Sequence, residues 1–573
     1  MIPVPSNKQE LLDLAQTLVE QCRVSVGMRS SFYQTLNQIT ETGRYDGGKA
    51  LINKMFKILD RTKSHLFSNI ELKFAMDFDR PRPRVDYDRA GEAAKVLGRT
   101  WERNGTGTTF QQGVFESLKY GACIHKQWVE MQGPEQNKPF YYDKLVMPWQ
   151  FGVYREDENR LDRQEALCET ITLTMPEVWK RIYHRDDAEK LFNRIKTHAQ
   201  SGVSTSNPQS FFHDILSTSQ LDTSSSPVTR PGGIMQLNNT PNYSTMGATI
   251  APETVDMHEL WVKDSEDYTT IQLIEPDIII APFHKRTNLL VKDSGLQPYR
   301  LIQPNVVTNW IWGRSELMDL VEPQGLLAQW CDDARRLMGI QFDKLLGFSG
   351  ETGLTDELYG QFRMAGYTNI GQGADIKDIT PKFPPETLPM LTFLIKTIDE
   401  LAGYPSIMQG QGDSGVRAND HAQTLMKTAS PTLRDRSLLV EFQCAAAADL
   451  TFELMQAKDE SNYWLKADDP VKDVDETKFL LADLPDDLRV TVDSHSSSPI
   501  FSEENTQLIF AAAKLGYVTG SYVLDNMPFP NKELAKLQLK EKETAQSKFM
   551  ENLMQTRPDL AEVMLKKQLG GKK

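Results

Sequence analysis

Three glycines form the pattern in this sequence that comes nearest to a known chemical site. Gly410, Gly412 and Gly415 spell G-x-G-x-x-G, the spacing that lets a backbone approach the pyrophosphate of a dinucleotide. That fingerprint follows a strand and opens a helix inside a βαβ unit, whereas here an apolar pattern of helical period precedes the glycines. Val416 and Arg417 also stand where a Walker A loop has Lys and then Ser or Thr. We therefore interpret these glycines as part of a connection between helices and not as a nucleotide site.

Other side chains with chemical potential form no recognisable catalytic set. The nine histidines are scattered, and neither an H-E-x-x-H nor a G-x-S-x-G motif occurs. Asp332 beside Asp333, and Asp375 near Asp378, could be pictured as metal carboxylates. Acidic pairs without converging histidines or glycine turns are weak metal signals, however, and solvated faces explain them better. The sequence therefore predicts no enzyme, no metal site and no cofactor.

The glycine-rich loop lies between two predicted helices. The apolar positions of the first helix are Leu391, Leu394, Ile395, Ile398 and Leu401. They recur at steps of three and four, so residues 387–402 are predicted to form an amphipathic helix. Gly403 and Pro405 end it, because glycine can take the left-handed conformation and proline cannot continue a helix. A longer helix is predicted to begin near Asp420 and to continue, bent, through Pro431.

Length and charge set bounds on the class of protein. A chain of 573 residues with 39% hydrophobic and 25% charged residues is predicted to fold into three or four domains. The net charge of −14, from 64 basic and 78 acidic residues, argues against a surface that wraps nucleic acid tightly. It leaves room for a protein along which DNA slides.

Cysteine usage and hydropathy predict the setting. Five widely spaced cysteines without a CxxC pair favour reduced thiols in a cytoplasmic setting over disulfides or zinc. The sequence contains neither an apolar leader near Met1 nor a run of about 18 apolar residues. We therefore expect a protein that is neither secreted nor membrane-spanning.

The remaining sequence alternates helical and strand patterns. Helices are predicted over residues 8–75, 110–120, 175–198 and 323–346. Strands are predicted over residues 122–131, 141–153, 166–174, 259–262, 268–280 and 488–493. Residues 200–250 are rich in Ser, Thr, Asn, Pro and Gly, and are predicted to form a flexible insert. From residue 502 the chain is predicted to be helical, and residues 531–573 carry ten Lys or Arg against six Asp or Glu.

This order of elements resembles the portal proteins of tailed bacteriophages, the head-to-tail connectors, over nearly the whole chain. One similar phrase is Trp-Gly-Arg-Ser-Glu-Leu-Met-Asp-Leu-Val-Glu-Pro-Gln-Gly at residues 312–325, which leads into a long helix. Another is Leu-Val-Met-Pro-Trp-Gln-Phe-Gly-Val-Tyr-Arg at residues 145–155, followed by the strand and helix of residues 166–182. The glycine-rich loop falls where that family has its tunnel loop. The insert at residues 200–250 departs from the common core of the family.

The resemblance implies an α+β multidomain fold that is mainly helical. It has an α/β wing, a stem of two long helices, a small α/β clip and a helical crown. The implied bounds are 1–314 for the first part of the wing, 315–347 for the first stem helix, 348–384 for the clip, 385–403 for the second stem helix, 404–420 for the tunnel loop, 421–500 for a long kinked helix that completes the wing, and 501–573 for the crown with a basic tail.

The resemblance also implies a function and a set of partners. Portal subunits form a ring, here twelve-fold if the chain follows the family, at one vertex of the capsid in the virion. Such a ring nucleates capsid assembly, docks the terminase large subunit, passes double-stranded DNA without sequence specificity during packaging and ejection, and then holds tail adaptor proteins. Major capsid proteins and scaffolding or internal core proteins are the remaining partners, and no membrane is involved.

Three groups of residues become candidate sites under this resemblance. The DNA-facing tunnel loop contains Gln409, Gly410, Gln411, Gly412, Ser414, Gly415 and Arg417. The stem is predicted to pack through Leu327, Trp330, Ala334, Met338, Leu391, Leu394, Ile398 and Leu401. A basic contact with DNA or a core protein is predicted at Lys566, Lys567, Lys572 and Lys573, for which a solubilising tail is the alternative.

Two other classes of function stay open. One is an enzyme that packages or processes nucleic acid, and the other is a helical scaffold protein of host origin. ATP hydrolysis by the purified protein would favour the enzyme, whereas a large ring in electron micrographs would favour the portal.

Overall fold

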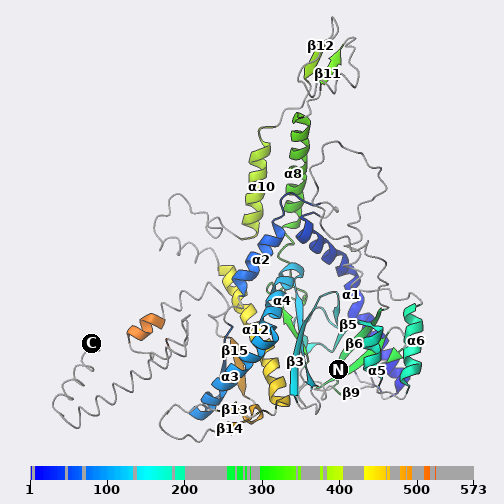
Figure 1. The fold of residues 1–573 in the computed structure, drawn as a ribbon, viewed down its shortest axis with the longest axis vertical. Coiled ribbons are helices and arrows are strands. Elements are labelled where there is room, and N and C mark those ends of the chain that lie inside the picture. Colours follow the sequence, from blue (N-terminus) through cyan, green and yellow to red (C-terminus); the bar gives the residue numbers. More distant parts are fainter. Residues whose placement is uncertain are drawn as a thin grey trace, which may run out of the picture. The chain divides into compact units, whose positions relative to one another are not determined.

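A computed structural model describes most of the chain up to residue 492 and a few residues beyond it (Figure 1). The described residues are 2, 5, 7–44, 49–67, 72–132, 138–183, 187–200, 254–264, 267–274, 278–279, 284–285, 297–342, 346–349, 375–378, 384–403, 431–459, 461, 463–464, 478–485, 487–492, 509–515 and 523. The chain divides into two compact units, Met1–Asp493 and Ser494–Lys573. In the second unit, residues 509–514 are helical.

The helices of the first unit account for much of its described part. They are α1 (Lys8–Thr42), α2 (Met55–Leu66), α3 (Arg84–Asn104), α4 (Thr106–Tyr120), α5 (Met175–Ile182), α6 (Ala188–Gln200), α8 (Val321–Phe342), α10 (Thr387–Leu401) and α12 (Pro431–Lys458). Local signals set several of their ends. The side chain of Asn7 accepts a hydrogen bond from the backbone of Gln9 at the start of α1, and Thr174 and Glu177 form a capping box at the start of α5.

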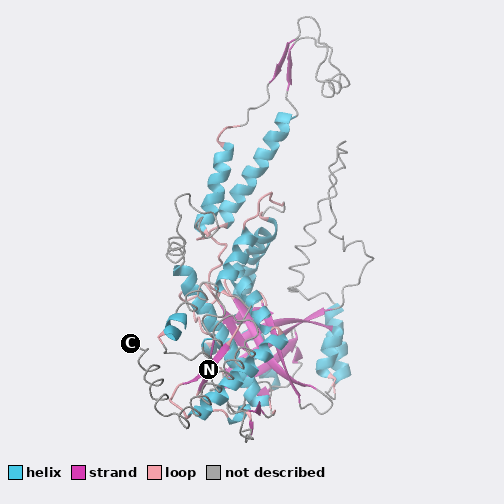
Figure 2. Cartoon of the chain, turned by 60° about the vertical axis from the view of Figure 1, so that its left-hand side comes forward, coloured by secondary structure: helices cyan, strands magenta, loops and turns pink. Residues whose placement is uncertain are grey.

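The strands form two larger sheets and three pairs, all antiparallel (Figure 2). The three-stranded sheet has the order β10 (Tyr299–Ile302), β2 (Cys123–Gln132), β3 (Lys138–Val146). The large sheet has the order β4 (Phe151–Val153), β5 (Ala166–Thr174), β6 (Thr254–Asp264), β7 (Asp267–Ile274), β8 (Ile278–Ile279), with β9 (His284–Lys285) also on β7. The pairs are β1 (Phe74–Phe78) with β15 (Leu488–Val492), β11 (Leu346–Ser349) with β12 (Asp375–Asp378), and β13 (Tyr463–Trp464) with β14 (Lys478–Phe479).

Strand alternation gives the large sheet two buried faces, because successive side chains point to opposite sides. Cys168 and Leu260 belong to a cluster with apolar residues of α1. Leu167 and Trp261 point the other way and join a cluster with the three-stranded sheet and with Leu450 of α12. Helices α5 and α6 pack in a cluster of their own with the far ends of β5 and β6. Most other helices, among them α8, α10 and α12, meet in one large helical core.

The mixed helix and sheet class predicted from the sequence is confirmed, as are most of the strands. Some boundaries are wrong. Residues 8–75 do not stay helical to their end, because β1 begins at Phe74, and the predicted helix 175–198 is two helices. The helix predicted over 323–346 ends at Phe342, and Leu346 already belongs to β11. The predicted start of the long helix near Asp420 lies outside the described residues. In the described part of the chain, α12 begins at Pro431.

Candidate functional site

The two helices predicted to form a stem lie side by side as an antiparallel pair, α8 and α10 (Figures 1 and 2). Near one end, Leu327 and Cys331 of α8 share the helical core with Ile398 of α10. Toward the other end, Leu337 of α8 lines a pocket with Thr387 of α10. The residue numbers therefore rise along one helix as they fall along the other. Between the two helices in the sequence the chain forms the antiparallel pair β11 and β12; β12 lies within the predicted clip, and β11 begins two residues before its predicted bound at 348.

The eight predicted stem residues divide into three groups within one chain. The buried residues are Leu327, Ala334, Leu394 and Ile398. Trp330 and Leu391 are partly buried and pack against the same core. Met338 and Leu401 remain 44% and 52% exposed. One chain therefore buries a single stripe of each helix and leaves part of the predicted contact set open.

The pair exposes further large apolar side chains. The exposed residues on the two helices are Leu326 (45%), Met338 (44%), Leu388 (63%), Phe393 (60%) and Leu401 (52%). On a helix with 3.6 residues per turn, Phe393 points about a quarter turn away from its buried neighbour Leu394. Several large apolar residues exposed on one short element are typical of an interaction surface. The surface is consistent with packing against another chain.

A connecting segment between α1 and α2 holds the start of α8. The side chain of Gln324 is fully buried. Its Nε2 donates to the carbonyl oxygen of Ile52 at 2.8 Å and to that of Gly43 at 3.3 Å, and its Oε1 accepts from the backbone N–H of Lys54 at 3.4 Å. These three hydrogen bonds satisfy a buried amide whose desolvation would otherwise be costly. They fix where α8 begins.

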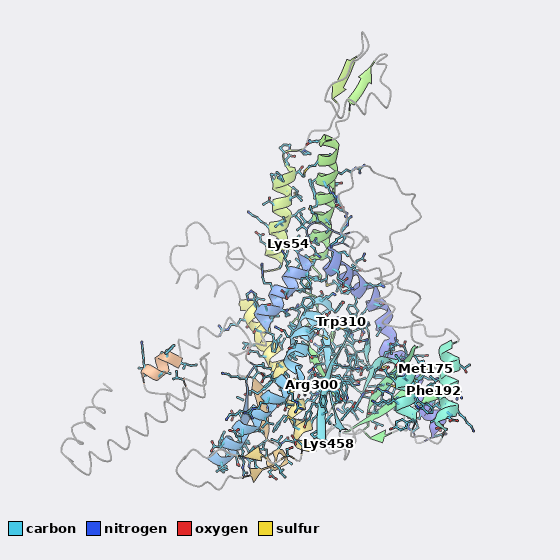
Figure 3. The ribbon with its side chains drawn as sticks, viewed as in Figure 1. Lys54, Met175, Phe192, Arg300, Trp310 and Lys458 are labelled. Carbon is cyan, nitrogen blue, oxygen red and sulfur yellow. The ribbon has the colours of Figure 1, made fainter. Side chains whose placement is uncertain are left out.

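The same connecting segment reaches both helices of the pair through ion pairs. Lys54, which Figure 3 labels beside α10, places its Nζ 2.5 Å from the Oδ2 of Asp399 on α10. It also donates to the carbonyl oxygen of Ile395 at 3.4 Å. Arg44 pairs with Asp332 on α8. One short segment therefore contacts α8 and α10 with one cation each, and we call Arg44, Lys54 and Gln324 with their partners the base clamp.

The segment of residues 312–325 packs against the C-terminal end of α4 and then leads into α8. Gly121, at the end of α4, has φ 99° and Gly313 has φ 63°. A Cβ on Gly121 would lie 2.5 Å from the carbonyl oxygen of Trp312, and one on Gly313 would lie 2.6 Å from that of Gly121. Both the backbone conformation and the close approach therefore require glycine.

Two side chains after Gly313 complete this junction. The hydroxyl of Ser315 donates to the carbonyl oxygen of Lys119 at 2.6 Å, which satisfies a terminal acceptor of α4. The carboxylate of Glu316 accepts from Arg436 of α12 at 2.9 and 3.1 Å and from Asn305 at 3.0 Å. The residues that lead into α8 are therefore tied to α12, the helix that follows the glycine-rich loop in the sequence.

A buried ion cluster links the two larger sheets. The Nζ of Lys126 on β2 lies 2.6 Å from an oxygen of Glu169 on β5 and 2.6 Å from an oxygen of Glu259 on β6. Glu169 and Glu259 are direct partners across β5 and β6, so two like charges face each other there. Tyr299 of β10 donates to Glu169 at 2.8 Å, and Lys144 of β3 approaches it at 2.5 Å.

The lysine controls the protonation of this cluster. Burial alone would raise the pKa of Glu259, but the charge and hydrogen bond of Lys126, with bonds from Trp261 and Gln272, hold it at about 2. Burial alone would lower the pKa of Lys126, but the two carboxylates raise it above its ordinary value. Lys126 and Glu259 therefore form an ion pair between the sheets, and Glu169 accepts hydrogen bonds from Lys126 and Tyr299.

The predicted loop and tail residues lie outside the described part of the chain. These are Gln409, Gly410, Gln411, Gly412, Ser414, Gly415, Arg417, Lys566, Lys567, Lys572 and Lys573. The boundary of the loop is described on its first side. Gly403, predicted to end the second stem helix, has φ 72°, and α10 ends at Leu401. The predicted helix end is confirmed.

Sequence reasoning missed the base clamp and the junction. Gln324, Lys54 and Glu316 contact residues far away in the sequence, and their types are ordinary for a protein surface. Periodicity identifies apolar stripes, and it carries no signal for a buried polar side chain whose partner is a distant carbonyl group. The conspicuous Gly-Arg-Ser-Glu phrase beginning at Gly313 was the one available hint.

Chemical sites of other kinds can be described only for the part of the chain that the structure covers. Within it, no group of three or more His, Cys, Asp or Glu residues is arranged to hold a metal ion. Among the described helices, none is both long enough and apolar enough to cross a membrane. The five cysteines are buried and are not joined in disulfides.

Comparison with known proteins gives no family for this chain. No family model matches it, and no curated protein matches it at a significant level.

Proposed function

We propose that this chain is the subunit of a portal ring at one vertex of a tailed-bacteriophage capsid, twelve-fold if it follows the family. The observation that carries the proposal is the α8–α10 pair. Two long antiparallel helices enclose an inserted segment, are clamped at one end by Arg44, Lys54 and Gln324, and leave apolar side chains exposed. Such a pair gains stability when neighbouring copies cover those side chains.

The order of elements around the pair supports the same function. The segment between α8 and α10 is enclosed by rigid helices, and segments on rigid scaffolds commonly carry partner contacts. We assign to residues 348–384 the docking of the terminase large subunit and later of tail adaptor proteins. The glycine-rich loop follows α10 in the sequence, and Arg436 of α12, beyond the loop, binds Glu316 in the segment that leads into α8.

Charge explains how such a ring would handle DNA. A net charge of −14 per chain repels phosphates and keeps double-stranded DNA from binding tightly to a channel. Isolated cations such as Arg417, repeated around a ring, would add weak, salt-screened contacts. The energy for packaging comes from a partner ATPase, and the ring remains in the virion for ejection.

Electron microscopy of the purified full-length protein tests the proposal. We expect single rings with a central opening. A preparation that contains only compact monomers or twofold dimers, at concentrations where portal-type rings should persist, would contradict it. ATP hydrolysis by a preparation without rings would favour the packaging or processing enzyme instead.

A further inference from the structure

An open groove lies between α12 and β15, at one end of the first unit. It has a volume of about 970 Å³. On α12, the apolar side chains of Leu438 and Phe442 line it and are 45% and 73% exposed. The groove residues on α12 recur at steps of three and four positions, some as adjacent pairs, so they share one face of the helix. Leu450 lies about a quarter turn around α12 from the middle of this face and joins the cluster between the two sheets.

The charged lining of the groove is mainly acidic. Its charged residues are Glu441, Asp449, Glu453 and Arg489. Arg489 is paired with Asp79 of the segment after β1 at 2.9 Å. Asp449 accepts a hydrogen bond from the backbone of Val490 at 2.7 Å, which holds β15 against α12 and forms the floor. The groove thus combines exposed apolar anchors with three acidic side chains, of which Glu441 is buried, and one basic side chain.

A second exposed surface has the opposite character. Helices α5 and α6 contain five basic and two acidic residues, in a chain that is acidic overall. Trp179 and Tyr183, one turn apart on α5, are 39% and 51% exposed. Trp179 makes an edge contact with Phe192 of α6, labelled in Figure 3, with ring centroids 5.2 Å apart. Lys196 lies one turn after Phe192 on the same side of α6.

A continuous series of contacts leads through the chain from the α5–α6 surface to the α12–β15 groove. Helices α5 and α6 pack on the far ends of β5 and β6. The near ends of these strands join the three-stranded sheet through Lys126 and its carboxylates. The three-stranded sheet packs on α12, where Arg300 of β10 donates to the carbonyl oxygen of Ala446 at 3.2 Å. The strand β15 then packs on α12 and completes the groove.

We propose that the α5–α6 surface of one copy docks in the α12–β15 groove of the next copy. The aromatic side chains of Trp179 and Tyr183 would meet the apolar anchors Leu438 and Phe442, and the basic residues would face the acidic lining. A contact between two different surfaces of the same chain is heterologous, and such contacts generate closed rings when the rotation between copies closes. This inference rests on the proposed ring and names the surfaces that join its subunits.

Charge and position favour a second copy as the occupant. The groove needs a partner with exposed aromatic side chains and positive charge, and this chain itself carries such a surface at the other end. A twofold dimer would instead bring the same patch of both copies together, so that two acidic grooves would face each other. That arrangement is disfavoured by like-charge repulsion.

Cysteine cross-linking tests the contact. Tyr183→Cys and Phe442→Cys place single reactive thiols on exposed positions, since the five native cysteines are buried. With a short bismaleimide, a mixture of the two variants should give cross-linked dimers, while either variant alone should not. The double variant should give a ladder of covalent oligomers. Dimers from Phe442→Cys alone would indicate a twofold contact and overturn the proposal.

The outcome separates this inference from the proposed function. Rings in electron micrographs without cross-linking in the mixture would overturn the inference and leave the portal proposal standing. Cross-linked chains without closed rings would support the contact and count against the portal. Absence of both would overturn both proposals.

A matched pair of charge reversals tests the electrostatic part. The double variant Lys180→Glu and Lys196→Glu reverses two charges on the side of α5 and α6 that carries Trp179 and Phe192. It should lower the cross-linking yield of the mixture several-fold. Lys190→Glu with Arg194→Glu makes the same change in charge on the other side of α6 and should leave the yield unchanged. Equal effects of the two pairs would show that only net charge matters, and would contradict docking through this surface.

Discussion

The two-sheet body and the α8–α10 pair differ in how much of their surface a single chain completes. In the body, Lys126 is buried and bonded to two carboxylates from a second sheet, and the sheets share one apolar cluster. In the pair, Leu394 and Ile398 are buried while Phe393 and Leu401 on the same helix are exposed. One chain therefore buries the charged groups and apolar faces of the body but leaves large apolar side chains of the pair exposed, and we propose that other copies cover them.

The largest effect is expected in the body. Lys126→Met leaves Glu259 buried without its counter-charge, and breaking a buried ion pair from one side costs about 3–5 kcal/mol. Denaturant unfolding of the full chain, followed by tryptophan fluorescence, would measure the change in the free energy of unfolding. Lys144→Met is the control, because the Lys144 side chain is 36% exposed and such pairs contribute about 1 kcal/mol or less. Equal losses in the two variants would contradict the bridge.

Substitutions at two neighbouring residues of α10 distinguish an effect on folding from an effect on assembly. Leu394→Asp puts a charge into the apolar core that Leu394 shares with Leu327 and Cys331 of α8, and should destabilise the pair by several kcal/mol. Phe393→Asp changes an exposed side chain and should alter the free energy of unfolding by about 0.5 kcal/mol or less, yet it should weaken association. Unfolding curves and analytical ultracentrifugation would measure both. Unchanged association in Phe393→Asp would show that this face of α10 contacts no other copy.

Acid should weaken the body at the point where the sheets join. In the folded chain the pKa of Glu259 is about 2, whereas the ordinary pKa of a glutamate side chain is 4.5. A depressed pKa stabilises the fold fully above pH 4.5, and this stabilisation is lost as the pH falls from 4.5 toward 2. The free energy of unfolding, measured across that window, should fall with a slope that Glu259→Gln reduces. An identical slope in the variant would refute the assignment.

The smallest effect is expected at the base clamp. Lys54 and Asp399 are partly exposed, with 21% and 17% of their side-chain surfaces accessible, so their coupling should be about 1 kcal/mol or less. A double-mutant cycle of Lys54→Met and Asp399→Asn would measure it. A coupling free energy of zero would mean that Gln324 and the Arg44–Asp332 pair hold the connecting segment without help from Lys54 and Asp399.

Elements with a periodic apolar face could be predicted from the sequence, whereas contacts between distant segments could not. The stripe through Leu394 and Ile398 predicts α10 because burial imposes a period on apolar residues. Helix α3 escaped prediction, since its buried positions are mostly small ones such as Ala90, Ala93 and Ala94. The strand β10 escaped because it has four residues. The contacts of Gln324 and Lys126 depend on chain segments brought together only by the fold, so no local pattern could reveal them.

The candidate sites also differ in how far the sequence could predict them. The stem residues were found because they are apolar and periodic. Met338 and Leu401 follow the period but lie beyond what one chain covers, so the period alone does not say which chain buries them. The loop residue Arg417 was selected for its charge among small residues, and its role stays a prediction.

Native mass spectrometry of the full-length protein measures how many copies assemble through the α8–α10 pair. We expect one dominant species near twelve times the chain mass of 65.1 kDa, or another closed multiple large enough to enclose a DNA duplex. We also expect that Phe393→Asp shifts this species toward the single chain. A wild-type protein that stays at 65.1 kDa, or at twice that mass, would contradict the claim that the α8–α10 pair is completed by other copies in a ring.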